Sequence, residues 1–300
     1  GSLLFAPPGA GGAGASPHYL FVTLGDGGGG GDPQRTGQNG QEWLGSILRV
    51  DVSRDDFTDD DERNYALIDD GANVAGALPE IWSTGWRNAY RCHFDTAPPH
   101  ALFCGDVGQN AWEEMTSVSL LGGASASRNA GWSCTEGVVS YRSRCDAPTD
   151  YRAPLFVYEN TGSTSIIGGP VVRRGADARL HGKLLLADYR KCVQWKDTKY
   201  VNVPCASNSW LTAIDETLSG GFAPLDTAVS TESPAVTRIF LQEASGGEVP
   251  TRSSNDELWS IDEDPNSGDV YVATARTSGV WRVVAPARCG IDAPPPPPPP

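Results

Sequence analysis

Short apolar runs separated by turn residues follow one another along the whole chain. The runs are a few residues long and rich in β-branched and aromatic side chains, which is typical of strands and too short for amphipathic helices. The sequence has 35 glycines, and clusters of turn-forming residues stand between the runs. The pattern predicts an all-β protein.

One of these runs recurs with a constant form, in which apolar and aromatic residues are followed by small residues and an aspartate. The copies lie at residues 19–26, 101–106, 183–188 and 269–274, and the last copy lacks the aspartate. Their starts are about 80 to 90 residues apart, and such a period indicates a repeat architecture.

Further strand-like runs flank the copies. Each copy is followed by a second run, at 46–52, 115–120, 192–196 and 279–284, and the last three are preceded by runs at 80–86, 165–173, and 238–241 with 257–261. Units of three or four antiparallel strands suit propeller blades with long insertions. We read Leu3–Phe5 as a middle strand, so the first of four blades is expected to lack its opening strands. Chance similarity within a pair of β-sandwiches is the alternative.

The chain divides into a propeller domain at 1–290 and a proline-rich linker at 291–300, where Pro294 begins a stiff polyproline II tract. The sequence opens with Gly-Ser-Leu-Leu-Phe and its only methionine is Met115. We therefore expect that the chain begins partway through the fold, with any signal peptide lost. It contains no run long enough to span a membrane.

The formal net charge of −14 and the pI near 4.6 argue against a nucleic-acid partner, because such binding needs clustered lysine and arginine. Six of the seven cysteines form three local pairs, Cys92 with Cys104, Cys134 with Cys145, and Cys192 with Cys205, and Cys289 is left over. Without CxxC spacing a zinc site is disfavoured, and structural disulfides in a secreted protein are expected. Buried free thiols in a cytosolic protein are the alternative.

Three stretches are richer in glycine and polar residues than packing requires. Residues 24–28 end a strand with Asp26 and flexible backbone, which suits close approach of a ligand, although a turn aspartate has the same pattern. Residues 83–91 contain Arg87 and Asn88, and the fork of donors on Arg87 suits a quinone, a carboxylate or an oxyanion unless it serves packing between blades. Residues 105–114 form a turn whose carbonyls and carboxylates suit calcium, but without EF-hand spacing.

These stretches, together with residues 44–51, Asn129-Ala130-Gly131-Trp132 and Ile167-Gly168-Gly169, resemble in order the signature of the glucose/sorbosone dehydrogenase family. The resemblance runs over residues 1–289 and is greatest to the secreted, hedgehog-interacting-protein-like branch. It implies a six-bladed propeller that oxidises aldose sugars with pyrroloquinoline quinone (PQQ) held by calcium at the axis.

The resemblance also implies roles for single residues. Asp26 matches the acid that orients the catalytic histidine, Arg87 the arginine beside quinone and substrate, and Asn88 its cofactor-contacting neighbour. Gly108 and Gln109 match the turn whose carbonyls bind calcium. Arg190 falls near a cofactor-contacting lysine, in an uncertain register.

Departures from the family pattern leave two functions open. The catalytic histidine is expected just before Gly1, and two cofactor-binding arginines are replaced near 253–256, where Asp256 would repel an anionic cofactor. The first function is a sugar dehydrogenase in the intact protein, with this chain alone inactive. The second is an extracellular module that binds a protein ligand and has lost the cofactor.

Overall fold

The computed structural model describes residues 1–7, 18–120, 127–143, 145, 147–160, 164–175, 178–189, 193–196, 199–202, 211–215, 236–239, 258–274 and 279–283. Within these ranges the regular structure consists of β-strands and two short 3₁₀ turns, η1 (Thr36–Gln38) and η3 (Ala178–Leu180). No helix in the described ranges is long and apolar enough to cross a membrane. The all-β prediction is confirmed.

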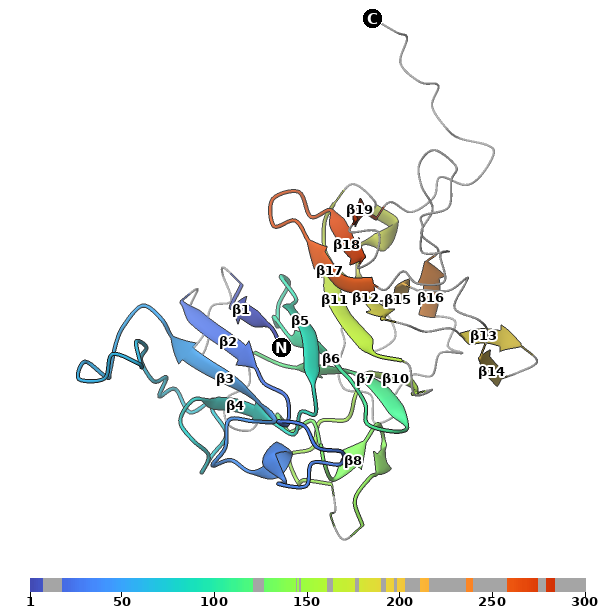
Figure 1. The fold of residues 1–300 in the computed structure, drawn as a ribbon. Coiled ribbons are helices and arrows are strands. Elements are labelled where there is room, and N and C mark those ends of the chain that lie inside the picture. Colours follow the sequence, from blue (N-terminus) through green and yellow to red (C-terminus); the bar gives the residue numbers. More distant parts are fainter. Residues whose placement is uncertain are drawn as a thin grey trace, which may run out of the picture.

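Four antiparallel sheets follow one another along the chain (Figure 1). The first contains β1 (Leu3–Phe5), β2 (Tyr19–Thr23), β3 (Ser46–Asp51) and β4 (Ile81–Thr84). The second contains β5 (Ala89–Phe94), β6 (Leu102–Asp106), β7 (Trp112–Val118) and β10 (Phe156–Glu159). The third contains β11 (Ile166–Val172), β12 (Lys183–Asp188), β15 (Leu211–Asp215) and β16 (Val236–Ile239), and the fourth β17 (Leu258–Glu263), β18 (Val270–Thr274) and β19 (Val280–Arg282). Two hairpins stand apart, β8 (Thr135–Glu136) with β9 (Val139–Ser140), and β13 (Val193–Lys196) with β14 (Lys199–Asn202).

The sequence repeat corresponds to the same strand position in each of the four sheets. Its four copies form β2, β6, β12 and β18, and each of these is the second strand of its sheet. The alternating burial of β18 reflects the two-residue period of a strand. β3 and β11 are buried along their whole length, as expected where both faces of a sheet are covered.

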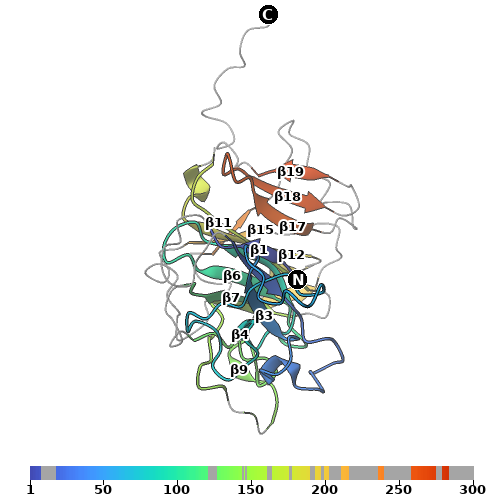
Figure 2. The ribbon, with the colours of Figure 1, turned by 90° about the vertical axis from the view of Figure 1, so that its left-hand side faces the viewer.

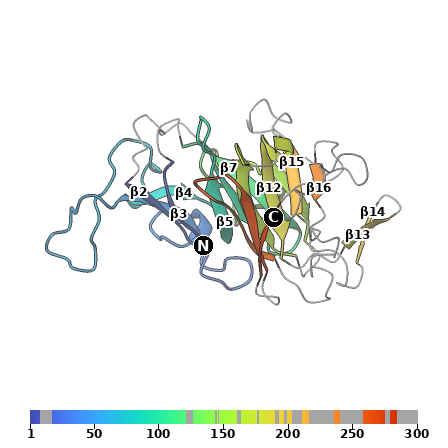
Figure 3. The ribbon, with the colours of Figure 1, turned by 90° about the horizontal axis from the view of Figure 1, so that it is seen from above.

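Successive sheets pack against one another, and Figure 2 shows β17–β19 at one end of the molecule, with β3 and β4 toward the other. Three apolar clusters fill the spaces, centred on Trp82 and Trp86, on Phe156 and Leu184, and on Leu185 and Ile261. The opening strand β11 contacts both β5 and β17. Figure 3, seen from above, has β5 between β3 on one side and β12 on the other.

Close packing at the opening strands requires a glycine at position 168. A Cβ on Gly168 of β11 would lie within 2.7 Å of the Gly105 amide nitrogen and would collide with the Arg91 carbonyl. Thr23 Oγ1 donates to the Ala89 carbonyl at 3.1 Å, which ties the first sheet to the second. The opening strands therefore meet along one line, as propeller blades do around an axis.

Several strand assignments from the sequence were wrong. β1 is the edge strand of a complete four-stranded sheet, because the chain returns from Ala6 to Tyr19 and pairs β2 with β1. Residues 81–84 form the outer strand of the first sheet rather than the opening strand of the second, which is β5. The run at 193–196 pairs with β14, and β12 takes β15 as its neighbour.

Two of the three predicted disulfides are confirmed. Cys92 and Cys104 face each other across β5 and β6, and Cys134 is bonded to Cys145. Cys192, Cys205 and Cys289 lie outside the described residues. The six-blade total and the linker at 291–300 stay predictions.

Candidate functional site

The polar stretches predicted from the sequence lie together at one end of β5 and β6. The Asp26 amide donates to the Arg87 carbonyl at 2.9 Å, and the Val107 amide donates to the Asn88 carbonyl at 3.2 Å. Asn88 is bound in turn through its own amide, which donates to Asp106 Oδ1 at 2.6 Å. Asp26, Arg87, Asn88 and the turn at Gly108 thus form one connected group.

Asp26 is buried and its carboxylate accepts two hydrogen bonds. Trp132 Nε1 donates to Oδ2 at 2.9 Å, and the Gly28 amide donates to Oδ1 at 3.0 Å. Trp132 belongs to the Asn-Ala-Gly-Trp stretch, which the sequence singled out without assigning it a contact. The structure therefore gives Asp26 an indole partner, while each oxygen keeps a second lone pair for another donor.

Arg87 extends between the connection that carries it and the turn after β6. Its Nη1 donates to the Val107 carbonyl at 2.7 Å and its Nε to Gln109 Oε1 at 3.3 Å, and the guanidinium lies 5.8 Å from the centre of the Trp132 ring. None of these acceptors is charged, so the positive charge of the half-buried guanidinium is not neutralised by an ion pair with a described residue. Such a cation can stabilise negative charge on a nearby ligand.

The turn after β6 is organised by the buried carboxylate of Glu136. Glu136 Oε1 accepts the amides of Gln109, Asn110, Ala111 and Trp112 at 2.7–3.3 Å. In a trans peptide the carbonyl points opposite to the amide, so the Gly108 and Gln109 carbonyls face away from Glu136. The described residues contain no group of three or more metal-binding side chains, so a calcium ion here would depend on those carbonyls.

Buried carboxylates accept hydrogen bonds from the backbone amides of this group. Burial raises the pKa of Asp106 to about 6, although the amides of Asn88 and Arg87 oppose this shift. Burial likewise raises the pKa of Glu113 to about 8, and Glu113 accepts hydrogen bonds from the Ile166 and Gly108 amides at 3.0 and 3.3 Å. The pKa of Glu114 is also raised well above its ordinary value, first by burial and then by Asp106.

A cavity of about 320 Å³ opens beside this group at the ends of the opening strands. We call it the axial cavity, because its walls come from three successive sheets. Its described lining consists of aromatic, neutral polar and apolar side chains, namely Asn88, Tyr90, Val107, Ser165, Tyr189 and Trp259. Tyr90 also joins two sheets, since its hydroxyl donates to the Trp259 carbonyl at 3.4 Å. Sequence analysis had found Asn88 but not the aromatic residues, which lie in ordinary strand-like runs.

The lining of the axial cavity is chemically compatible with a planar ring system and with a hydroxylated ring. Aromatic faces stack on planar rings, and the amide of Asn88 and the hydroxyls of Tyr90 and Ser165 suit carbonyl and hydroxyl groups. The described lining contains no lysine or arginine, and two arginines contact lining residues: Arg87 donates to the Val107 carbonyl and Arg91 lies 5.0 Å from the centre of the Tyr90 ring. Arg190 and residues 253–256 lie outside the described ranges.

Comparisons with known proteins agree with this picture. The HIPL1 protein of Arabidopsis thaliana is 29% identical over 311 residues, which cover 97% of this chain, and HIPL2 of the same plant is 28% identical over 310 residues. The chain spans only 39% of the length of each of these relatives. No family model matches the chain.

A solved structure of a glucose dehydrogenase has the same fold, with a TM-score of 0.57 at 17% identity, covering 95% of this chain and 64% of that chain. The propeller prediction for the fold class is thereby confirmed. The chain is a homologue of the HIPL proteins with the fold of a glucose dehydrogenase, and it resembles the glucose/sorbosone dehydrogenase family near its hedgehog-interacting-protein-like branch.

Proposed function

We propose that the intact, secreted protein binds PQQ and calcium at the axial cavity and oxidises an aldose sugar there. The observation that carries the proposal is the meeting of Arg87, Asn88 and the Gly108 turn beside a cavity walled by aromatic residues. The sequence motifs of the glucose/sorbosone dehydrogenase family and the shared fold support it. The two disulfides are compatible with an extracellular location.

Individual residues of the chain would have the following roles. The carbonyls of Gly108 and Gln109 would hold calcium, and Asn88, Tyr189 and the face of Trp259 would hold the quinone, which when bound accepts a hydride from the sugar. Arg87 would stabilise negative charge that develops on an oxygen of the ligand, because its guanidinium is held by neutral acceptors alone.

Proton transfer is the step for which the described residues offer no assigned base. Asp26 would orient such a base through a free lone pair, with Trp132 fixing the carboxylate. Arg190 is a further candidate contact to the cofactor.

A binding titration tests the proposal. The full-length protein, supplied with calcium, should bind PQQ in a calorimeter. Trp259→Ala should weaken this binding at least about fivefold, since one aromatic stacking contact contributes about 1 kcal/mol. Trp43→Ala is the matched control, because Trp43 is 40% exposed, Trp259 is 50% exposed, and only Trp259 lines the cavity. Absence of PQQ binding, or equal weakening by both variants, would rule the cofactor site out.

A second function has one observation in its favour. The described lining of the axial cavity has no basic side chain, although PQQ is a tricarboxylate. A propeller that binds an extracellular protein or a neutral sugar without a cofactor would not need a basic side chain in this cavity. The same titration separates the two functions, because this module gives no heat with PQQ.

A further inference from the structure

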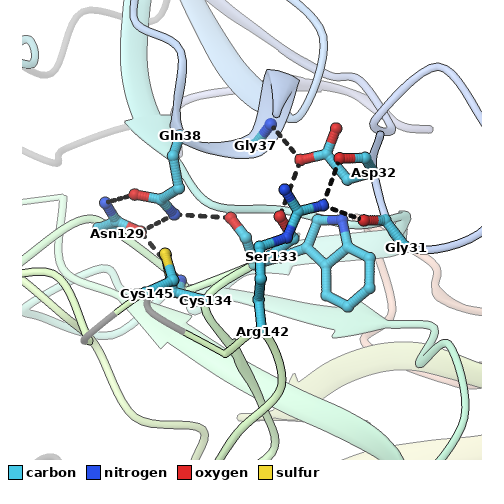
Figure 4. Close-up of a disulfide and its surroundings, with 11 residues drawn as sticks. Gly31, Asp32, Gly37, Gln38, Asn129, Ser133, Cys134, Arg142 and Cys145 are labelled. Carbon is cyan, nitrogen blue, oxygen red and sulfur yellow. Dashed lines mark hydrogen bonds between the residues drawn. A yellow bond between two sulfur atoms is a disulfide. The ribbon is translucent and has the colours of Figure 1, made fainter. Parts of the chain in front are cut away.

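A second cavity, of about 280 Å³, lies at the disulfide between Cys134 and Cys145 (Figure 4). We call it the disulfide pocket. Its remaining walls come from the loop between β2 and β3, from the residue before Cys134 and from the segment after β9, through Gln34, Arg35, Gln38, Asn39, Ser133 and Arg142. None of these residues lines the axial cavity.

Two arginines give the disulfide pocket a positive charge inside an acidic protein. Its described lining includes no aspartate or glutamate, whereas the whole sequence has 37 acidic and 23 basic residues. Neither Arg35 nor Arg142 forms an ion pair with a described residue. The Asp32 carboxylate adjoins the pocket through the lining residue Ser133, but it is buried and also accepts hydrogen bonds from the Thr36 and Gly37 amides.

Arg142 is held in place with part of its donor fork unused. Its Nη2 donates to the Gly31 and Asp32 carbonyls, the latter at 2.7 Å, and Figure 4 shows the guanidinium turned toward this loop. Nε and Nη1 have no hydrogen-bond partner among the described residues, although they belong to a pocket-lining side chain. The disulfide fixes the segment that carries Arg142, so that these donors are positioned in advance.

Arg35 supplies the second cation and is free to bind. It is exposed, and its side chain has no hydrogen-bond partner in the described part of the chain. The backbone at Arg35 has a φ of 59°, a conformation that costs an arginine about 1 kcal/mol relative to glycine. Gln34 likewise makes no side-chain hydrogen bond to a described residue, and the hydroxyl of Ser133, which donates to Asp32 Oδ2 at 3.1 Å, keeps its lone pairs.

From these groups we propose that the disulfide pocket binds a hexuronate, that is, a sugar ring carrying a carboxylate. The planar fork of Arg35 matches a carboxylate, and Nη1 of Arg142 can donate a further single hydrogen bond to it. Neutral amides and a hydroxyl are the usual partners of ring hydroxyls. The volume suits one monosaccharide rather than a chain of several. The site is separate from the axial cavity and does not depend on the function proposed there.

Calorimetric titration of the full-length protein with galacturonate tests the proposal, with galactose and inorganic sulfate as comparison ligands. Galacturonate should bind at least about tenfold more tightly than either, because only it offers both a carboxylate and ring hydroxyls. Arg35→Gln should weaken galacturonate binding at least about tenfold. The variant should fold normally, because the exposed Arg35 side chain makes no hydrogen bond or ion pair with a described residue.

Two control variants assign the effect to this pocket. Arg54→Gln removes the same charge from an arginine that is 61% exposed and lies outside the pocket, and it should leave binding unchanged. Trp259→Ala should also leave it unchanged, since that residue lines the axial cavity. The proposal is overturned if galacturonate does not bind, if galactose or sulfate binds equally well, or if Arg54→Gln weakens binding as much as Arg35→Gln.

Discussion

Removing the Asp26 carboxylate should reveal how strongly Trp132 is coupled to it. Asp26 is 7% exposed and Trp132 is 3% exposed, and the indole Nε1 lies 2.9 Å from Oδ2. A buried hydrogen bond to a charged acceptor contributes about 1.5 to 3 kcal/mol, and solvent screening at this depth is small. Asp26→Ala should therefore lower the free energy of unfolding by about 3 kcal/mol, since it leaves the buried indole Nε1 of Trp132 without its acceptor.

A double-mutant cycle isolates the contact between the two residues. Trp132→Phe removes the donor and keeps an aromatic ring, so the cycle of Asp26→Ala with Trp132→Phe should give a coupling energy of about 1.5 to 2 kcal/mol in urea denaturation. Asp55→Ala is the matched control, because Asp55 accepts the amide two residues later, at 2.7 Å, as Asp26 does, but is exposed. A coupling energy below about 0.5 kcal/mol, or equal effects of Asp26→Ala and Asp55→Ala, would refute the reasoning.

Two further predictions concern the second sheet. Replacing Cys92 and Cys104 by serine should lower the free energy of unfolding by about 2 to 4 kcal/mol, because the disulfide closes a loop with a sequence separation of 12. Equal denaturation midpoints for the oxidised parent and the variant would contradict this prediction. Burial lowers the pKa of His93 to about 4; Asp262 opposes this shift and Arg91 reinforces it. The neutral imidazole therefore contributes its full stabilisation above pH 6.5, and this stabilisation is lost as the pH falls toward 4. Between pH 7 and 4 the free energy of unfolding of His93→Gln should therefore fall by up to about 3 kcal/mol less than that of the parent, measured by denaturation at each pH. The same pH dependence in variant and parent would contradict this prediction.

The sequence predicted those parts of the fold that depend on local pattern. The repeated run marks the second strand of each sheet because strand period and turn residues are local properties. Which strands pair is not local: residues 81–84 could close one sheet or open the next, and packing around Trp82 and Trp86 decides for the first. The cross-strand disulfide at Cys92 was predictable from its short loop.

The candidate site was predictable only in part. Asp26, Arg87 and Asn88 stand out in the sequence because they lie in glycine-rich motifs that interrupt strands. Trp132 lies in a stretch that the sequence also marks, but its contact with Asp26 could not be predicted. Glu136 does not stand out at all, because it lies in a short hairpin that only the folded chain brings near the site. The aromatic residues of the axial cavity lie in strand-like runs with the same pattern as core strands, so only the folded structure shows that they line a cavity.

The central claim is tested most directly by sugar oxidation in the full-length protein. Loaded with PQQ and calcium, it should reduce a dye with an aldose as electron donor, and Arg87→Ala should lower the rate at least about tenfold while PQQ remains bound. A fully loaded protein that reduces no dye with any aldose, or an Arg87→Ala variant as fast as the parent, would contradict the account.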